Sequence, residues 1–239
     1  MMTMKKMSYV VLCASLVLGA SSAQAQLRVE ITGIGSNQIP VAVASFVNES
    51  AAPQSLSGII KADLARSGVF KLIDADAPVS ETAPVSYDQW KSRGADALAA
   101  GSVQSMADGR LDVRYKLFDT IKGAQISSMN NAAAPQFNRL LAHKIADDIY
   151  EKLTGTKGAF ATRIAYVTQS GREYRLEVAD ADGEGIQVAL RSNEPIISPS
   201  WSPDGTKVAY VSFEKKKPIV YVQNLVTRQR TIVSNEKGS

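Results

Sequence analysis

The feature that most constrains the fold is an internal repeat in the last third of the chain. Residues 163–167 (RIAYV) recur as residues 207–211 (KVAYV), an offset of 44 positions. The same offset pairs two further strand-like segments, 176–178 with 220–222 and Val188 with Ile232. Three segments in one register indicate a repeating all-β unit of roughly 40–45 residues, the length of a four-stranded β-propeller blade.

A turn motif stands between the two repeats. Pro203 presets φ for the first corner of a turn, Asp204 tolerates the second corner, and Gly205 frees the exit. Taken alone, the motif also fits a generic hairpin, but its place at a repeat boundary favours the blade interpretation. Trp201 is expected to fill the space between adjacent blades. The predicted structural turn consists of Trp201, Ser202, Pro203, Asp204 and Gly205.

One complete repeat and most of a second precede Ser239, the last residue of the sequence. Each blade buries its faces against its neighbours, so a stable array needs about three units and a closed propeller typically four to eight. Residues 156–239 are therefore predicted to form an incomplete β-propeller of about two blades in a truncated chain. The open blade edge is expected to leave this part marginally stable when alone.

Residues 26–155 mix strand and helix patterns and are predicted to form an α/β domain. The apolar run 41–46 is typical of a buried strand, and 69–73 indicates another. Residues 54–67 carry apolar side chains at helical spacing, and Gly68 follows where a positive φ ends many helices. Strands interleaved with helices predict a mixed sheet covered by helices on at least one face.

A hairpin and a short helix are predicted in the middle of this domain. Residues 98–106 and 111–118 flank Asp108-Gly109, a two-residue turn signal. Ser86 and Gln89 have the spacing of a capping box, in which the serine side chain caps the start of a helix.

The last predicted helix begins near Pro135 and ends at Gly155. His143, the only histidine in the chain, is placed on its polar face with Asp147 one turn later. A metal or acid/base role is conceivable, but a solvent-facing histidine with a helical ion pair is the favoured interpretation. With no second histidine and no mature cysteine, a zinc site has no ligand set.

The first 25 residues are predicted to be a cleaved signal peptide. Lys5 and Lys6 form a positive region, the apolar stretch 9–18 follows, and Ala23-Gln24-Ala25 fits a cleavage site before Gln26. A membrane anchor is the alternative, but spanning needs roughly 20 apolar residues. Because this segment holds two lysines and no acid, its removal lowers the net charge from +4 to +2. So small a surplus does not indicate nucleic-acid binding.

The sequence contains few residues of the types that catalysis or metal binding needs. Its one cysteine, Cys13, lies in the predicted signal peptide, so the mature chain has no thiol for a disulfide, a metal or a nucleophile. The nucleophile pattern Gly-x-Ser-x-Gly is absent from the sequence. Residues 180–185 (DADGEG) start like a calcium loop, but Arg191 stands where the loop needs an acid, which favours a strand-connecting turn. We predict no catalytic residue, no metal and no cofactor.

The order of these features resembles the amino-terminal part of the TolB family, periplasmic components of the Tol-Pal system. The resemblance covers the whole chain and is carried by 201–210 (WSPDGTKVAY), 70–74 (FKLID) and 142–150 (AHKIADDIY). It implies a periplasmic, non-catalytic protein with a six-bladed propeller that binds the peptidoglycan-associated lipoprotein Pal. It also implies a role in outer-membrane integrity and in outer-membrane invagination during cell division.

The resemblance further implies that the mature N-terminal segment signals to the inner-membrane protein TolA and is coupled to Pal binding. That segment is Gln26, Leu27, Arg28, Val29, Glu30, Ile31 and Thr32. From the residues alone, 27–31 alternates like a strand and could join a partner's sheet edge or pack on its own domain, the latter being favoured. The missing blades count against Pal binding by this chain, whereas TolA binding would not depend on them.

Two other function classes are weighed. Propellers also follow α/β peptidase domains in some hydrolases, but a single histidine on a polar helix face gives such an enzyme no catalytic set. A cell-wall or sugar ligand site would need an aromatic platform, and aromatic residues make up only 7% of the chain.

Overall fold

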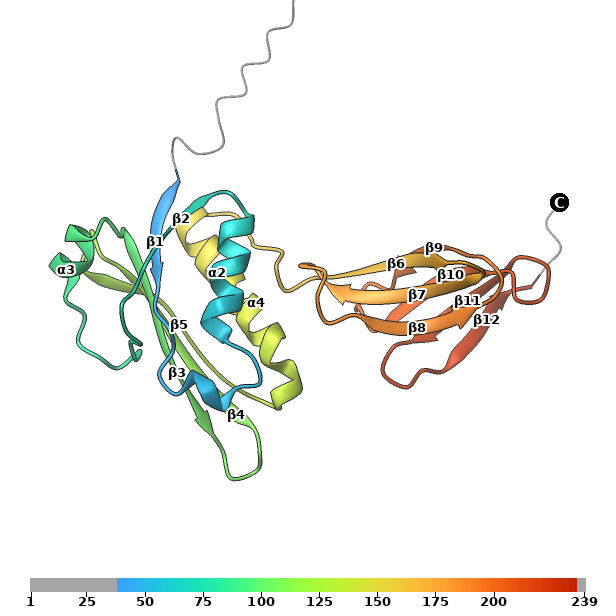
Figure 1. The fold of residues 1–239 in the computed structure, drawn as a ribbon, viewed down its shortest axis with the longest axis horizontal. Coiled ribbons are helices and arrows are strands. Elements are labelled where there is room, and N and C mark those ends of the chain that lie inside the picture. The colour runs from blue at the N-terminus through green and yellow to red at the C-terminus, as the bar shows by residue number, and fades with distance from the viewer. Residues whose placement is uncertain (1–37, 236–239) are drawn as a thin grey trace, which may run out of the picture. The chain divides into compact units, whose positions relative to one another are not determined.

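The computed structural model describes residues 38–235, and Figure 1 shows their fold. Five strands of the first half form one sheet in the order β2-β1-β3-β4-β5. The strands are β1 (Ile39–Val43), β2 (Phe70–Ile73), β3 (Ala97–Ser105), β4 (Leu111–Asp119) and β5 (Ala124–Ala133). β1 runs parallel to β2 and β3, whereas β3, β4 and β5 pair antiparallel. The predicted mixed sheet is therefore confirmed.

Helices cover both faces of this sheet. Successive strand residues point to opposite faces, so one strand contributes side chains to a core on each face. Val41 of β1 belongs to the core beneath α2 (Leu56–Arg66) and α4 (Asn138–Thr154), which lie side by side over one face (Figure 1). Ala42, the next residue, belongs to a second core that contains Trp90 of α3 (Tyr87–Ser92). The sheet thus has a core on each face, and α2 and α4 share one of them.

The ends of the two long helices follow from local backbone chemistry. Ser55 caps α2, since its Oγ accepts a 2.9 Å hydrogen bond from the backbone N–H of Gly58. The prediction of a helix over 54–67 is confirmed to within two residues at each end. Gly155 ends α4 with φ of 76°, and a short 3₁₀ turn (η2, Pro135–Phe137) precedes that helix. A second 3₁₀ turn, η1 (Glu49–Ala51), precedes α2.

Two local predictions about the α/β part are wrong in detail. The Ser86 side chain makes no capping hydrogen bond at the start of α3. The hairpin between β3 and β4 has a three-residue loop, because Met106 N–H still donates to Arg110 O at 2.8 Å. Only Gly109 in this loop has a positive φ, whereas the tight two-residue turn needs positive φ at both central residues.

Residues 163–234 form two antiparallel sheets. The first has the order β6-β7-β8 and the second the order β12-β11-β10-β9. Their strands are β6 (Arg163–Ser170), β7 (Glu173–Asp180), β8 (Gln187–Ser192), β9 (Ile196–Trp201), β10 (Lys207–Ser212), β11 (Ile219–Asn224) and β12 (Arg230–Ser234). In the residues that the structure describes, these sheets do not close into a ring, as predicted for an incomplete propeller.

The two sheets have the same strand pairing, displaced by one repeat. The equivalent pairs are Ala165↔Val178 with Ala209↔Val222, and Glu177↔Val188 with Tyr221↔Ile232. Even the irregularities correspond, since one sheet has its register shift at Leu176/Glu177 and the other at Val220/Tyr221. Residues 164–167 and 208–211 therefore occupy equivalent strands, which confirms the repeat.

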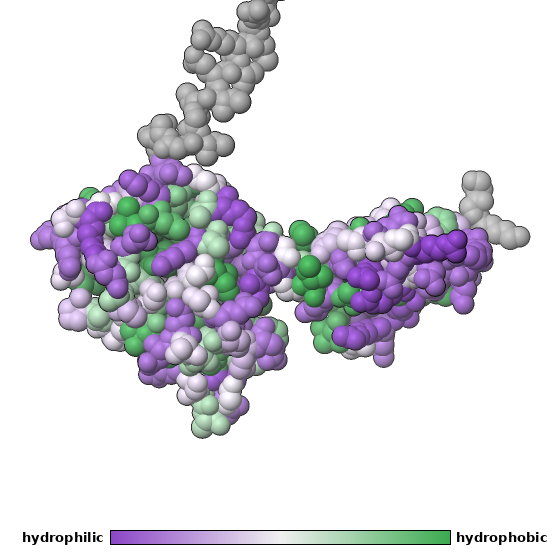
Figure 2. All heavy atoms as spheres, in the orientation of Figure 1, coloured by the Kyte–Doolittle hydropathy of each residue, from purple (hydrophilic) through white to green (hydrophobic). Residues whose placement is uncertain are grey.

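One core lies between the two sheets. Leu176 from the first sheet clusters with Val208, Tyr210 and Tyr221 from the second, and Trp201 packs against them. The second sheet also exposes apolar side chains, with 52% of Ile232 accessible. On the visible face of the molecule, hydrophobic areas lie among hydrophilic residues (Figure 2). Among the helices of residues 38–235, none is long and apolar enough to span a membrane.

Candidate functional site

The TolA-type segment, residues 26–32, and the predicted signal peptide, residues 1–25, lie outside the described residues. The structure does place the turn at 201–205, where Ser202 Oγ donates to Asp204 Oδ1 at 2.6 Å and Gly205 has φ of 66°.

Several hydrogen bonds of that turn converge on the carboxylate of Asp204. Its carboxylate accepts from the hydroxyl of Ser202 and from the backbone N–H and hydroxyl of Thr206. These hydrogen bonds, that of Ser202 first, lower the pKa of Asp204 to about 2. Nearby, the guanidinium of Arg163 lies 5.0 Å from the ring of Trp201 and donates to Gly205 O at 2.6 Å. The first strand of one sheet therefore contacts the turn of the next.

A buried polar cluster around His143 is the most unusual arrangement of charged groups in the described residues. The prediction of a solvent-facing His143 paired with Asp147 is wrong, because His143 is only 1% exposed. Asp147 instead accepts hydrogen bonds from the backbone N–H groups of Phe160 and Ala161. The face of α4 that carries His143 packs against α2, so a residue placed on the polar face by spacing is buried by tertiary contact.

Asp63 of α2 binds one side of the imidazole. Its Oδ2 lies 2.6 Å from His143 Nδ1, and the Asp63 carboxylate is fully buried. Arg66, one turn later, approaches the other oxygen of Asp63 at 3.3 Å. Burying a carboxylate without partners is costly, so these two contacts are what make Asp63 tolerable in the core.

Arg139 binds the other side of the imidazole and links α4 to the turn that follows β7. Its Nη2 lies 3.4 Å from His143 Nε2 and 2.5 Å from Asp182 Oδ2, and its Nε donates to Asp180 Oδ2 at 2.9 Å. Burial opposes the charge on Asp182, but the N–H of Glu184 and the guanidinium of Arg139 outweigh it and lower the pKa of Asp182. Burial likewise opposes the charge on Arg139, yet the two carboxylates raise its pKa.

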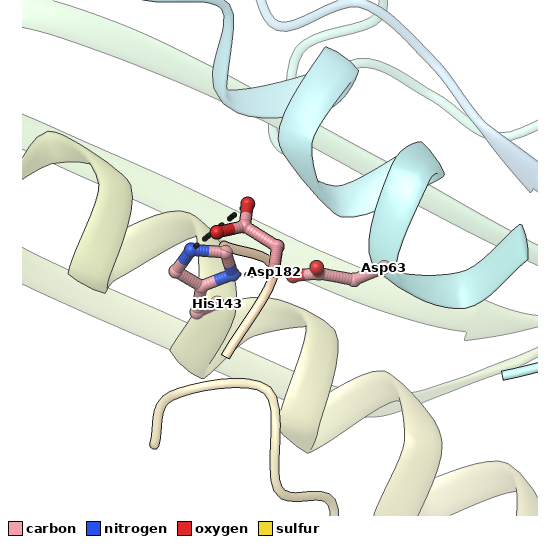
Figure 3. A group of neighbouring side chains, drawn as sticks. All are labelled: Asp63, His143 and Asp182. Carbon is pink, nitrogen blue, oxygen red and sulfur yellow. Dashed lines mark hydrogen bonds and ion pairs between the residues drawn. The ribbon is translucent and has the colours of Figure 1, made fainter. Parts of the chain in front are cut away.

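The turn at 180–185 is confirmed as a strand-connecting turn. Gly183 N–H donates to Asp180 O at 2.9 Å, and Gly183 has φ of 85°. Figure 3 shows Asp63, His143 and Asp182 converging from three segments that are distant in sequence. A cation placed among them would meet the guanidinium of Arg139, which already donates to Asp182. The geometry therefore favours an internal salt-bridge cluster over a metal site.

The cluster is poorly suited to acid/base catalysis. In the described part of the chain, Nδ1 of His143 contacts Asp63 and Nε2 faces Arg139, so neither ring nitrogen is paired with a hydroxyl nucleophile. What the cluster can do is hold three elements together: α2, α4 and the turn between β7 and β8.

Sequence reasoning missed Asp63 and Arg139, although the sequence carries one signal for each. Asp63 falls between Ile60 and Leu64, within the apolar stripe of α2, where a carboxylate needs a buried partner. Arg139 stands four residues before His143, on the same side of α4. Neither pattern identifies Asp180 or Asp182 as the partners.

Comparisons with known proteins give the same family for both parts of the chain. A family model described as the TolB amino-terminal domain matches residues 27–126, and one described as the TolB beta propeller domain matches residues 150–239. The crystal structure of TolB from Acinetobacter baumannii is 33% identical with a TM-score of 0.72, and the match covers 84% of this chain and 50% of that chain. The chain thus spans about half the length of this relative.

Other propellers are much less similar. The β-propeller domain of the Trilobed protease from Pyrococcus furiosus is 13% identical with a TM-score of 0.26, and the match covers 58% of this chain and 39% of that chain. Puromycin hydrolase matches at 13% identity and a TM-score of 0.27, covering 58% of this chain and 23% of that chain.

Proposed function

Because the chain belongs to the TolB family, we propose that it acts as a non-catalytic interaction protein of a Tol-Pal-type assembly in the periplasm. The observation that carries this proposal is the agreement of the two family models, one for each part of the chain, with a relative that is 33% identical. Family membership supports a periplasmic protein of the Tol-Pal type and a family without catalytic activity. The cluster around His143 is consistent with a structural rather than a chemical role.

The proposed role is to maintain outer-membrane integrity and to support outer-membrane invagination during cell division. In this role the family links a TolA-type inner-membrane protein to a Pal-type lipoprotein, and this chain is proposed to provide the TolA-type contact. Two repeat sheets stack over one shared core, and stacked repeats present extended binding surfaces in repeat proteins.

TolA-type binding is proposed to use the segment Gln26, Leu27, Arg28, Val29, Glu30, Ile31 and Thr32. Apolar and charged residues alternate from 27 to 31, so one face of an extended segment would be apolar and the other charged. Such a segment can add to the open edge of a partner's sheet, where backbone hydrogen bonds give affinity and alternate side chains give specificity. Pal-type binding is proposed to depend on blades beyond the two sheets described.

A pull-down separates the two partners. Purified residues 26–239 and 33–239 are incubated with the periplasmic domains of a TolA-type and a Pal-type protein. We expect 26–239 to retain the TolA-type domain and 33–239 to lose it, with little Pal-type binding by either. Equal TolA-type binding by the two would remove the assignment to residues 26–32.

A matched pair of variants tests the strand-addition geometry. Replacing Leu27, Val29 and Ile31 by serine removes the apolar face, whereas replacing Arg28 and Glu30 by serine removes the charged face. The first variant is expected to lose TolA-type binding and the second to retain most of it. The opposite ranking would exclude an apolar strand face as the contact.

The enzyme alternative has its own test. Peptidase substrates are offered to the chain and to a His143→Ala variant. We expect no turnover by either protein, and turnover that His143→Ala abolishes would favour the hydrolase instead.

A further inference from the structure

We propose that His143 is a proton-binding site that tightens the contact between α4 and the turn at 180–185 as the pH falls. The proposal is independent of the proposed function, because it concerns only groups within the described residues. The imidazole is surrounded by charges from three different elements.

The charged groups facing His143 come from every element packed around it. α2 contributes Asp63, at 2.6 Å from Nδ1, and behind it Arg66. α4 contributes Arg139, at 3.4 Å from Nε2. The turn after β7 contributes Asp180 and Asp182, each with an oxygen 3.8 Å from Nε2.

The hydrogen-bond pattern shows which ring nitrogen carries the proton when His143 is neutral. An ionised carboxylate only accepts hydrogen bonds, so Nδ1–H donates to Asp63. Nε2 then carries the lone pair and accepts from Arg139 Nη2. A second proton on the ring would sit on Nε2, where it faces two carboxylates and one guanidinium.

Charge balance favours that second proton while the turn is in place. Three carboxylates, those of Asp63, Asp180 and Asp182, surround the ring with two guanidiniums, those of Arg66 and Arg139. A neutral His143 leaves the group with one excess negative charge, and a protonated His143 makes it neutral. Charges within about 4–6 Å interact strongly enough to decide the ionisation of a neighbour.

The sign of the coupling follows from which charges leave when the contact opens. Asp180 and Asp182 belong to the turn, so opening removes both of them and leaves the imidazolium with Asp63, Arg66 and Arg139. The joined form therefore binds the second proton more tightly than the open form. By linkage, proton uptake stabilises the joined form, so the contact is expected to be tighter at low pH than at high pH.

Burial of the ring opposes protonation in both forms. Asp63 of α2 contacts Nδ1, on the side of the ring away from the turn, so much of the burial is expected to persist when the turn moves away.

The chain contains one histidine, so its imidazole can be observed directly by NMR. The Cε1–H signal of His143 is followed from pH 8 to pH 5 in residues 26–239 and in an Asp180→Asn, Asp182→Asn variant. Removing the two carboxylates is expected to move the titration midpoint to lower pH. An Asp108→Asn variant, altered on the β3–β4 loop, is the matched control and should leave the midpoint in place. A midpoint that does not move in the double variant overturns the proposal.

Hydrogen exchange gives a second readout that does not need the double variant to fold. Backbone amides of residues 181–184 are compared at pH 5.5 and 7.5, after correction for intrinsic exchange rates. The wild-type chain should exchange more slowly at pH 5.5, and His143→Gln, which does not titrate, should show no such difference. The same pH response in His143→Gln, or faster wild-type exchange at pH 5.5, would also overturn the proposal.

Discussion

Gln223 of the second repeat sheet donates a hydrogen bond of 2.8 Å to the backbone carbonyl of Ala189 in the first. The other end of the same amide accepts from the hydroxyl of Tyr210 at 3.1 Å, and Gln223 is 3% exposed. One buried side chain thus satisfies polar groups on both sides of the boundary between the sheets. Buried polar groups left without partners cost free energy, so this amide ties the register of one sheet to the other.

Replacing Gln223 by alanine should destabilise the repeat part. The change leaves the Ala189 carbonyl and the Tyr210 hydroxyl without this partner, at a cost of about 1–3 kcal/mol. Urea unfolding measures the change in free energy. Gln229→Ala, at an exposed position of the loop between β11 and β12, should stay within about 0.5 kcal/mol of wild type. Equal effects of the two substitutions would mean that the amide does not hold the sheets together.

Replacing Asp63 by alanine should be among the most damaging single changes in the α/β part. It breaks a buried pair and leaves His143 with an unpaired N–H, at a cost of about 3–5 kcal/mol. Asp74→Ala is the control, because Asp74 is exposed, and its expected effect is within about 0.5 kcal/mol. Thermal unfolding followed by circular dichroism distinguishes them, and a mild effect of Asp63→Ala would contradict a tightly paired cluster.

The end of α4 offers a test of backbone conformation alone. Gly155 has φ of 76°, and a Cβ added there would meet no atom within 4 Å. Gly155→Ala should therefore cost about 1 kcal/mol through backbone strain and not through a clash. Gly155→Asn should cost less, because asparagine tolerates the left-handed region better. Chemical denaturation of the two variants gives the ranking, and an equal or reversed ranking would point to a cause other than φ.

The turn between the repeats should respond to acid only at very low pH. The folded pKa of Asp204 is about 2, below the unfolded value of about 3.9, so its contribution is present above pH 4 and is lost as the pH falls through the folded pKa. Ser202→Ala removes the leading hydrogen bond and should raise the pKa of Asp204. Carboxyl carbon NMR reports the titration, and a midpoint unchanged by Ser202→Ala would show that the serine does not stabilise the carboxylate.

Local and periodic features could be predicted from the sequence. The 44-residue offset between 163–167 and 207–211 anticipated two sheets with equivalent pairing, because a repeated pattern must fold into a repeated unit. Gly155 was recognised as a helix end because its conformation depends on neighbouring backbone only. The turn at 180–185 followed from its composition, which disfavours both strand and helix.

The cluster around His143 could not be derived in the same way. Asp63 lies 80 residues from His143, and Asp180 and Asp182 lie beyond the end of α4, so their meeting depends on how α2, α4 and β7 pack. Helical spacing placed His143 on a polar face, but polarity along one helix does not say what packs against it. The prediction that Ser86 caps α3 was wrong for a related reason, since the spacing of Ser86 and Gln89 permits a capping hydrogen bond without requiring one.

The measurement that tests the account most directly is calorimetric titration of a TolA-type periplasmic domain into residues 26–239. We expect saturable binding at one site, and loss of that binding in a chain that starts at residue 33 but has the same unfolding midpoint. Absence of binding by the 26–239 chain, or full binding by the shortened one, would contradict an interaction protein that engages this partner through its N-terminal segment.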